Sequence, residues 1–173
     1  MAYRSATDEL FVFGGVDDNE NYAQGFWVFD GQTWTELSPA TLPPPREEGA
    51  MVYDVARDRL VLFGGGGDGS RLNDTWEYDG TDWSEISLPL SPTARRGHTM
   101  QYQPDTGLIV VFGGYNGEYL DDTWQYDGAS WTELSPANVP PARQNAAMVY
   151  QDNGLLLLFG GRIPILNYGN DTW

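Results

Sequence analysis

The amino-acid sequence contains no cysteine, a single histidine and few basic residues. Without cysteine the chain forms no disulfide and offers no thiol nucleophile, and one histidine gives at most a weak metal or acid–base site. Only 9 lysine and arginine residues stand against 25 aspartate and glutamate residues, which gives a net charge of −16. An acidic surface of this kind repels phosphate backbones, so the composition excludes nucleic acid as an expected partner.

Long apolar runs are also missing. No segment approaches the roughly 20 consecutive apolar residues of a membrane-spanning helix, and residues 1–20 do not pair a charged start with an apolar core, as a signal peptide does. We therefore expect no membrane span, and the composition leaves the compartment open. Seven tryptophans and 40% hydrophobic residues, in contrast, are sufficient for an ordered core.

A repeat of about fifty residues organises the whole chain. Paired glycines recur at this period, and tryptophans recur in two further columns, with those of the second column 49 and 48 residues apart. Such a period with paired glycines and aromatics is typical of a blade-forming repeat. The repeated residues are the glycine pairs at 14–15, 64–65, 113–114 and 160–161, a first tryptophan column of Trp27, Trp76, Trp124 and Trp173, and a second of Trp34, Trp83 and Trp131.

Each copy predicts four short strands, which we call a to d in chain order. Strand b is an unbroken run of apolar residues that ends in phenylalanine before the glycine pair, as in 60–63. Since this run does not alternate, both faces of strand b are expected to be buried. Aspartate-glycine pairs separate strands c and d, where a tight hairpin needs residues that tolerate positive φ. One such meander cannot bury both of its faces alone, so the copies must pack face to face around an axis, as propeller blades do.

These residues resemble the kelch repeat. In that family, hydrophobic residues precede a glycine pair, a spaced aromatic pair follows, and a Pro-x-x-Arg-like segment leads into the innermost strand, here ending at Arg46, Arg95 and Arg143. The resemblance covers essentially the whole chain and implies an all-β, kelch-type β-propeller. It divides the single domain 1–173 into copies at about 1–37, 46–86, 95–134 and 143–173, of which three are complete four-stranded blades and the fourth is incomplete.

The pattern Asp-Thr-Trp, Tyr-Asp-Gly and a further Trp is similar to kelch repeats of large bacterial, often extracellular, proteins. This resemblance slightly favours an extracellular or cell-surface location. The first copy lacks the Pro-x-x-Arg segment, and the last copy stops inside strand c. We therefore expect the chain to be a fragment of a larger propeller.

Because every strand reverses direction, the b–c loops and the d–a linkers emerge on one face of the predicted disc. The b–c loops at 16–25, 66–73, 115–121 and 162–170 differ in sequence while the scaffold repeats, and repeat scaffolds usually carry specificity in such loops. The candidate binding residues in these loops are Asp17, Asp18, Tyr115 and Asn116. The alternative is that the loops vary because nothing constrains them.

Two further groups have both a functional and a structural interpretation. A ring formed by Arg46, Arg95 and Arg143 near the mouth of the central channel could bind a carboxylate or sulfate. Their strict periodicity instead favours a structural tie from each linker to the neighbouring blade. His98 stands beside Arg95 and Arg96 and could be a base or a ligand, although a lone histidine makes a weak site.

Carboxylates at Asp17, Asp18 and Glu20 could offer oxygen ligands to a hard cation. Their spacing fits no calcium loop, and a turn that caps its own backbone is favoured. The sequence therefore predicts no metal site, no cofactor and no catalytic residues. We expect a non-catalytic binding module for a protein or carbohydrate ligand. The alternatives are part of a carbohydrate-active propeller enzyme with catalytic residues in other blades, and a structural spacer in a large surface protein.

Overall fold

The computed structural model describes residues 1–19, 21–164 and 168–173, and within them every regular element is a β-strand. The strands form four antiparallel sheets, in each of which the order in space equals the order in the chain. The predicted all-β class and the meander of strands a to d are therefore confirmed. Among the described residues, none lies in a helix of the length and apolarity needed to cross a membrane.

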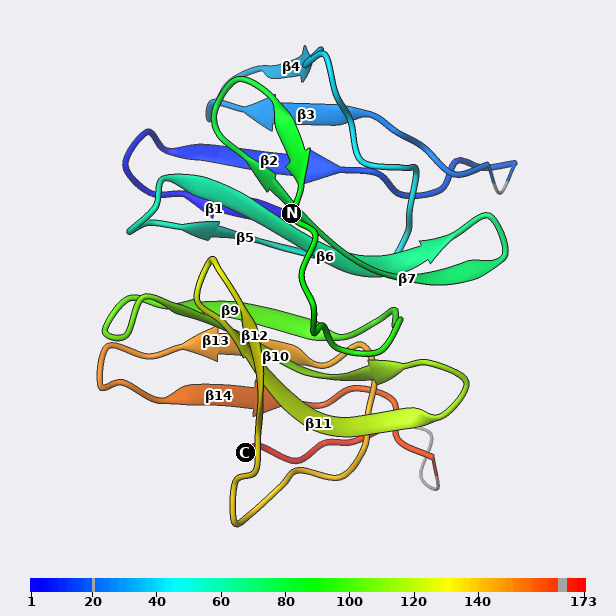
Figure 1. Ribbon diagram of the computed structural model, residues 1–173, viewed down its shortest axis with the longest axis vertical. Helices are drawn as coiled ribbons and strands as arrows, with labels where there is room; N and C mark the ends of the chain where they lie inside the picture. The colour runs from blue at the N-terminus through cyan, green and yellow to red at the C-terminus, as the bar shows by residue number, and fades with distance from the viewer. Residues whose placement is uncertain (20, 165–167) are drawn as a thin grey trace.

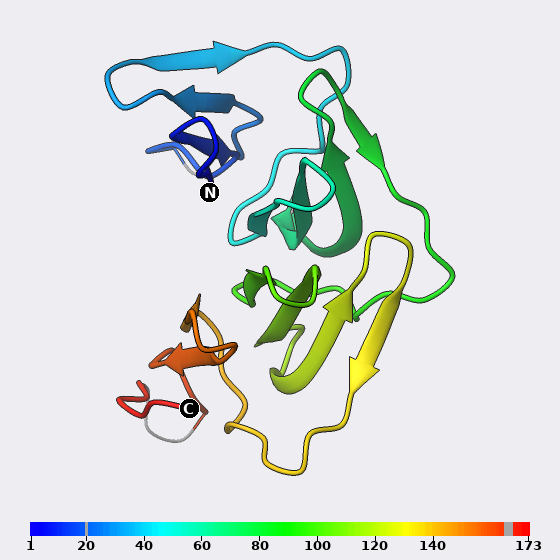
Figure 2. The ribbon, with the colours of Figure 1, turned by 90° about the vertical axis from the view of Figure 1, so that its left-hand side faces the viewer.

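Each sheet is one blade, and the four blades are stacked in chain order (Figure 1). Figure 2 shows them arranged in an arc, with the first strand of each blade on the inner side and the last strand of blades 1 to 3 on the outer side. Blade 1 consists of β1 (Ala2–Arg4), β2 (Glu9–Phe13), β3 (Phe26–Phe29) and β4 (Trp34–Leu37); blade 2 of β5 (Ala50–Asp54), β6 (Arg59–Gly67), β7 (Ser70–Tyr78) and β8 (Trp83–Glu85); blade 3 of β9 (Thr99–Gln103), β10 (Leu108–Tyr115), β11 (Tyr119–Tyr126) and β12 (Trp131–Leu134); and blade 4 of β13 (Ala147–Tyr150) and β14 (Leu156–Phe159).

The hydrophobic core lies between the blades. Along β6, Val61 belongs to the cluster shared with blade 3, whereas Leu62 belongs to the cluster shared with blade 1. Both side chains are at most 2% exposed, so strand b is buried on both faces, as its unbroken apolar run predicts. Two tryptophans of the second column lie in these interfaces, Trp83 between blades 1 and 2 and Trp131 between blades 2 and 3, while Trp34 is 47% exposed. The repeat therefore places its largest side chains where they hold one blade to the next.

Strand b runs further than the sequence indicates. β6 and β10 continue through the glycine pair and turn back into β7 and β11, so much of the predicted b–c loops 66–73 and 115–121 is hairpin rather than loop. The pairing register of β6 shifts between Phe63 and Gly65, and β10 has the same shift. The glycine pairs cause this bulge, because their positive φ values bend the strand without ending it.

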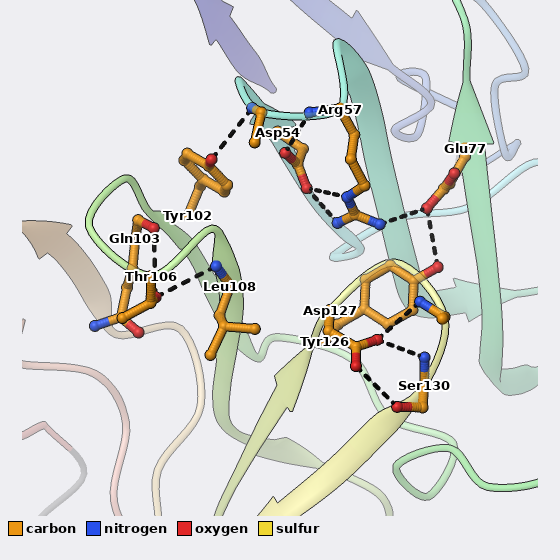
Figure 3. A network of polar contacts seen from close by, with 12 residues as sticks. Asp54, Arg57, Glu77, Tyr102, Gln103, Thr106, Leu108, Tyr126, Asp127 and Ser130 are labelled. Atoms are coloured by element: carbon orange, nitrogen blue, oxygen red, sulfur yellow. Dashed lines mark hydrogen bonds and ion pairs between the residues drawn. The ribbon is translucent and has the colours of Figure 1, made fainter.

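A polar network joins blades 2 and 3 (Figure 3). Asp54 is fully buried, and its carboxylate accepts hydrogen bonds from the backbone N–H of Arg57 at 3.1 Å and from its Nε at 2.7 Å. Arg57 also pairs with Glu77 at 3.3 Å, and Glu77 accepts a hydrogen bond from the hydroxyl of Tyr126 in blade 3 at 2.9 Å. The buried carboxylate is tolerated here because the arginine satisfies it.

Candidate binding site at the channel mouth

The periodic arginines are buried inside the blades that they precede. The guanidinium of Arg95 is fully buried and donates to both carboxylate oxygens of Asp122, at 2.6 and 2.7 Å, and to the carbonyl of Gly113 at 3.0 Å. Its Nε donates to the carbonyl of Thr93 at 2.9 Å. The equivalent acceptors are Asp74, Gly64 and Pro44 for Arg46, and Asp171, Gly160 and Pro141 for Arg143.

The backbone of the same arginines holds the preceding blade. The carbonyl of Arg95 accepts a hydrogen bond from the N–H of Gly65 at 2.8 Å, and its N–H donates to the carbonyl of Leu72 at 3.0 Å. Both partners lie in blade 2. The sequence favours a structural tie from each linker to the neighbouring blade, and the backbone of each arginine makes this tie. The side chain binds its own blade, while the backbone binds the neighbour, so each arginine joins two blades.

Each arginine also affects the charge of its aspartate. Burial acts to raise the pKa of Asp122, but the hydrogen bonds and the positive charge of Arg95 outweigh it, and the pKa lies below its ordinary value. The same balance lowers the pKa of Asp74 beside Arg46. Both aspartates are therefore ionised at neutral pH and engage the arginines fully. A ligand-binding role for the arginine ring, including Arg143, stays a prediction that no contact supports.

His98 lies between blades 2 and 3. It is 7% exposed, and its ring packs edge-on against Phe63 of blade 2, with centroids 5.3 Å apart. Burial, together with the charge of Arg95, lowers the pKa of His98 to about 3, so the imidazole is neutral at physiological pH. It therefore packs as an aromatic core residue, and a binding role for it stays a prediction.

The residues that follow the arginine column lie side by side across blades 2 to 4. Glu48, Gly97 and Asn145 occupy one position in blades 2, 3 and 4, and their φ values are 50°, 61° and 56°. The N–H of Gly97 donates to the carbonyl of Glu48 at 2.9 Å, and the N–H of Asn145 donates to the carbonyl of Gly97 at 2.6 Å. Positive φ is uncommon for residues with a Cβ. Here a chain of hydrogen bonds across three blades supports it, so the backbone of these linkers is held in place.

Side chains of these linkers converge on a pocket of about 300 Å³. Arg96 donates to Glu47 at 3.0 Å and pairs with Glu48 at 3.3 Å, and the amide of Asn145 donates to Glu48 at 3.3 Å. A concave site with converging hydrogen-bond donors and acceptors suits a polar ligand. We call this site the mouth pocket; it is lined by Glu48, Arg96, Gln144, Asn145, Gly161, Arg162 and Tyr168.

The hairpins of blades 2 and 3 also meet. The guanidinium of Arg71 in β7 lies over the ring of Tyr115 at 5.0 Å, and Tyr115 packs edge-on against Tyr119. Asn116 forms the hairpin turn, because its side-chain oxygen accepts a hydrogen bond from the N–H of Glu118 at 3.1 Å. The structure thus brings Tyr115 to an arginine of the neighbouring blade, whereas Asn116 serves its own turn. Ligand binding by either residue stays a prediction.

The acidic loop of blade 1 caps its own backbone. The carboxylate of Asp17 accepts hydrogen bonds from the N–H groups of Asn21 and Asn19, at 2.9 and 2.8 Å, and hydrogen bonds from these residues lower the pKa of Asp17. Asp18 is exposed, and Glu20 lies outside the described residues. Within the described part of the chain, no three His, Cys, Asp or Glu residues gather as a metal site requires. Ligand binding by Asp17 and Asp18 stays a prediction.

Glu48, Arg96, Asn145 and Arg71 received no binding role from the sequence. A signal for the first three was present, because the two residues after each repeated arginine are Glu-Glu, Arg-Gly and Gln-Asn. Variation directly beside a fixed column marks positions that the scaffold leaves free to differ. The predicted site used such variation only in the b–c loops, and otherwise rested on the arginines themselves.

The comparisons with known proteins agree with this architecture. The family model described as the KLHDC2/KLHL20/DRC7 Kelch-repeats domain matches residues 1–161. This range contains all fourteen strands found in the described residues and every residue of the mouth pocket except Arg162 and Tyr168. No curated protein matches the chain.

Proposed function

The chain belongs to the kelch-repeat family, and from this premise we propose that it is a non-catalytic binding module whose partner docks at the mouth pocket. Kelch repeats are generally protein-interaction modules. The partner that we propose is a segment of another protein, which would lie on the face formed by the b–c hairpins and the d–a linkers. A rigid scaffold that presents different loops on one face suits such a role.

The convergence of three blades on the mouth pocket carries this proposal. Glu48 comes from blade 2, Arg96 from blade 3 and Asn145 from blade 4, and hydrogen bonds or ion pairs hold their side chains together. These groups present a carboxylate, a guanidinium and an amide at a fixed spacing. A peptide backbone and its polar side chains need such paired donors and acceptors. Exposed Tyr168 adds an aromatic surface at the edge.

The position of the lone histidine supports a non-catalytic role. A general base must reach its substrate and hold a pKa near the working pH. His98 is buried between two blades, and its pKa of about 3 makes it a weak base. The kelch-repeat domain likewise suggests a binding module rather than an enzyme.

Selection from a displayed library of random peptides tests this function. We expect the selected peptides to lose at least tenfold in affinity when Arg96→Ala and Arg162→Ala are combined, since both side chains line the mouth pocket. Arg59→Ala, in the first residue of β6, is the matched control and should leave binding unchanged. Peptides that bind the double variant as tightly as the wild type would place the site elsewhere. The chain is also tested on a glycan array. If it binds glycans but selects no peptides, and the double variant binds no glycan, the partner is a carbohydrate instead.

A further inference from the structure

A second pocket opens between blades 1 and 2, beside the b–c hairpins. The b–c loop of blade 1 and the β6–β7 hairpin of blade 2 lie side by side there (Figure 1), and the pocket between them has a volume of about 460 Å³. None of its lining residues belongs to the mouth pocket. We call it the hairpin pocket; its lining includes Tyr22, Pro44, Pro45, Asp68, Ser70 and Leu72.

Hydrogen bonds of the scaffold hold the walls of the hairpin pocket in place. The side-chain amide of Gln24 donates to the carbonyl of Pro43 at 2.9 Å, which ties the loop of blade 1 to the following linker. In the hairpin, the hydroxyl of Ser70 donates to the carbonyl of Gly67 at 3.0 Å. A Cβ at Gly67 would stand 2.6 Å from the carbonyl oxygen of Pro45, so the hairpin also touches the linker. A ligand therefore meets a preformed site, which lowers the entropic cost of binding.

Among the described residues that line the hairpin pocket, Asp68 alone carries a charge. Its side chain is exposed, and within the described part of the chain its carboxylate makes no hydrogen bond or ion pair. Other aspartates serve the scaffold: Asp17 and Asp79 cap their own turns, and Asp74 binds Arg46. The φ of 46° at Asp68 suits a hairpin turn, but the turn uses only its backbone. The carboxylate is left available to a ligand.

The other walls of the hairpin pocket are largely apolar. Pro44, Pro45 and Leu72 contribute aliphatic groups, and Tyr22 contributes an aromatic ring. Lysine and arginine side chains match this lining, because their methylene stems pack on apolar surfaces while their charged heads stay at the rim. A carboxylate and an aromatic ring both attract a cation. The net charge of −16 adds a long-range attraction for basic groups.

A smaller hollow adjoins both pockets. It shares Tyr22 with the hairpin pocket and Arg96 with the mouth pocket. Arg96 is already paired with two glutamates, and Arg71, which also lines the hollow, lies over the ring of Tyr115. Neither arginine lines the hairpin pocket, where Asp68 keeps the local charge negative. One segment of a partner can therefore extend from the mouth pocket to the hairpin pocket.

We propose that the hairpin pocket binds a lysine or arginine side chain of the partner protein. This inference rests on the proposed function, because the side chain belongs to the protein segment that docks at the mouth pocket. Its stem lies along Pro44, Pro45 and Leu72, and its cationic head pairs with Asp68 beside the ring of Tyr22. The hairpin pocket thus selects for a basic residue in the partner.

A nuclear magnetic resonance titration with Nα-acetyl-lysine N-methylamide tests the pocket directly. We expect the amide signals of Gly67, Asp68 and Ser70 to shift and to saturate. The norleucine analogue, which lacks only the ammonium group, should bind about three- to fivefold more weakly. Asp68→Asn, whose asparagine tolerates the same turn, should remove this difference. Glu118→Gln is the matched control, because it removes an exposed carboxylate from the equivalent hairpin of blade 3, and it should keep the difference.

The titration separates this inference from the proposed function. The Arg96→Ala and Arg162→Ala double variant should bind the lysine probe as the wild type does, since neither residue lines the hairpin pocket. If peptide selection fails while the probe binds, the proposed function is wrong and the hairpin pocket remains a site for a basic group. The inference is overturned if no amide of the hairpin shows a saturable shift, or if the lysine and norleucine compounds bind the wild type equally. Selected peptides in which lysine and arginine are no more frequent than in the library overturn it too.

Discussion

Trp131 in blade 3 donates its indole hydrogen to the hydroxyl of Thr75 in blade 2, at 3.0 Å, and both residues are at most 2% exposed. The interface between blades 1 and 2 lacks this bond, because Phe26 stands where Thr75 stands. No acceptor for Nε1 of Trp83 is found within the described residues. Phe26 instead packs edge-on against Trp83, with centroids 5.3 Å apart. At this tryptophan, one interface therefore combines packing with a hydrogen bond, while the other has aromatic contact.

Replacing Thr75 with valine tests the value of that bond. Thr75→Val keeps the shape of the side chain but leaves the buried indole N–H of Trp131 without its acceptor. We expect the free energy of unfolding to fall by about 1–3 kcal/mol, measured by urea denaturation. Thr123→Val, at the equivalent position of blade 3, is the control and should change stability by less than about 0.5 kcal/mol. Equal losses in the two variants would contradict this account.

Removing the carboxylate of Asp122 should lower the free energy of unfolding far more than Thr75→Val does. Asp122→Ala leaves the fully buried guanidinium of Arg95 without the anion that neutralises it. Breaking a buried ion pair in this way costs about 3–5 kcal/mol, which is a large part of the stability of a domain of this size. Asp121→Ala, the control, removes an exposed carboxylate one residue earlier. Its free energy of unfolding should lie within about 0.5 kcal/mol of that of the wild type. If Asp122→Ala unfolds at the wild-type urea concentration, the arginine column does not hold the blades.

The blades could be predicted from the sequence because their signals are local. The glycine pairs, the apolar run of strand b and the aspartate-glycine turns each determine the conformation of a few neighbouring residues, and the fifty-residue period repeats the result. The mouth pocket could not be predicted in this way. Glu48 and Asn145 are 97 residues apart in the chain and meet only because blades 2 to 4 form an arc. Likewise, the environment of Trp83 depends on which residue blade 1 presents to it.

The glycine pairs are needed for close approach as well as for φ. Gly113 has a φ of 64°, and a Cβ there would stand 2.6 Å from the backbone carbonyl oxygen of Arg143. Gly107 has a similar φ of 69°, but nothing lies within 4 Å of its Cβ position. In both Gly113→Ala and Gly107→Ala, the strain of a left-handed backbone should lower the free energy of unfolding by about 1–2 kcal/mol. In Gly113→Ala, overpacking against the carbonyl of Arg143 should lower it by about 1–3 kcal/mol more. Urea denaturation of the two variants measures the cost of this contact as the difference between their free energies of unfolding. Equal losses of stability would mean that backbone conformation alone requires glycine at position 113.

The buried histidine makes stability depend on pH. Because the pKa of His98 is about 3 in the folded chain and about 6.5 in an unfolded one, the unfolded state binds an extra proton between these values. Stability therefore falls as the pH drops below 6.5, by about 2 kcal/mol at pH 5. His98→Ala, which introduces the residue found at the equivalent position 146, should remove this slope between pH 5 and 7. The alanine variant also loses packing against Phe63, but that loss is the same at every pH. Parallel stability curves for the two chains would show that the folded protein accepts the proton at His98, and that blades 2 and 3 separate enough there to admit water.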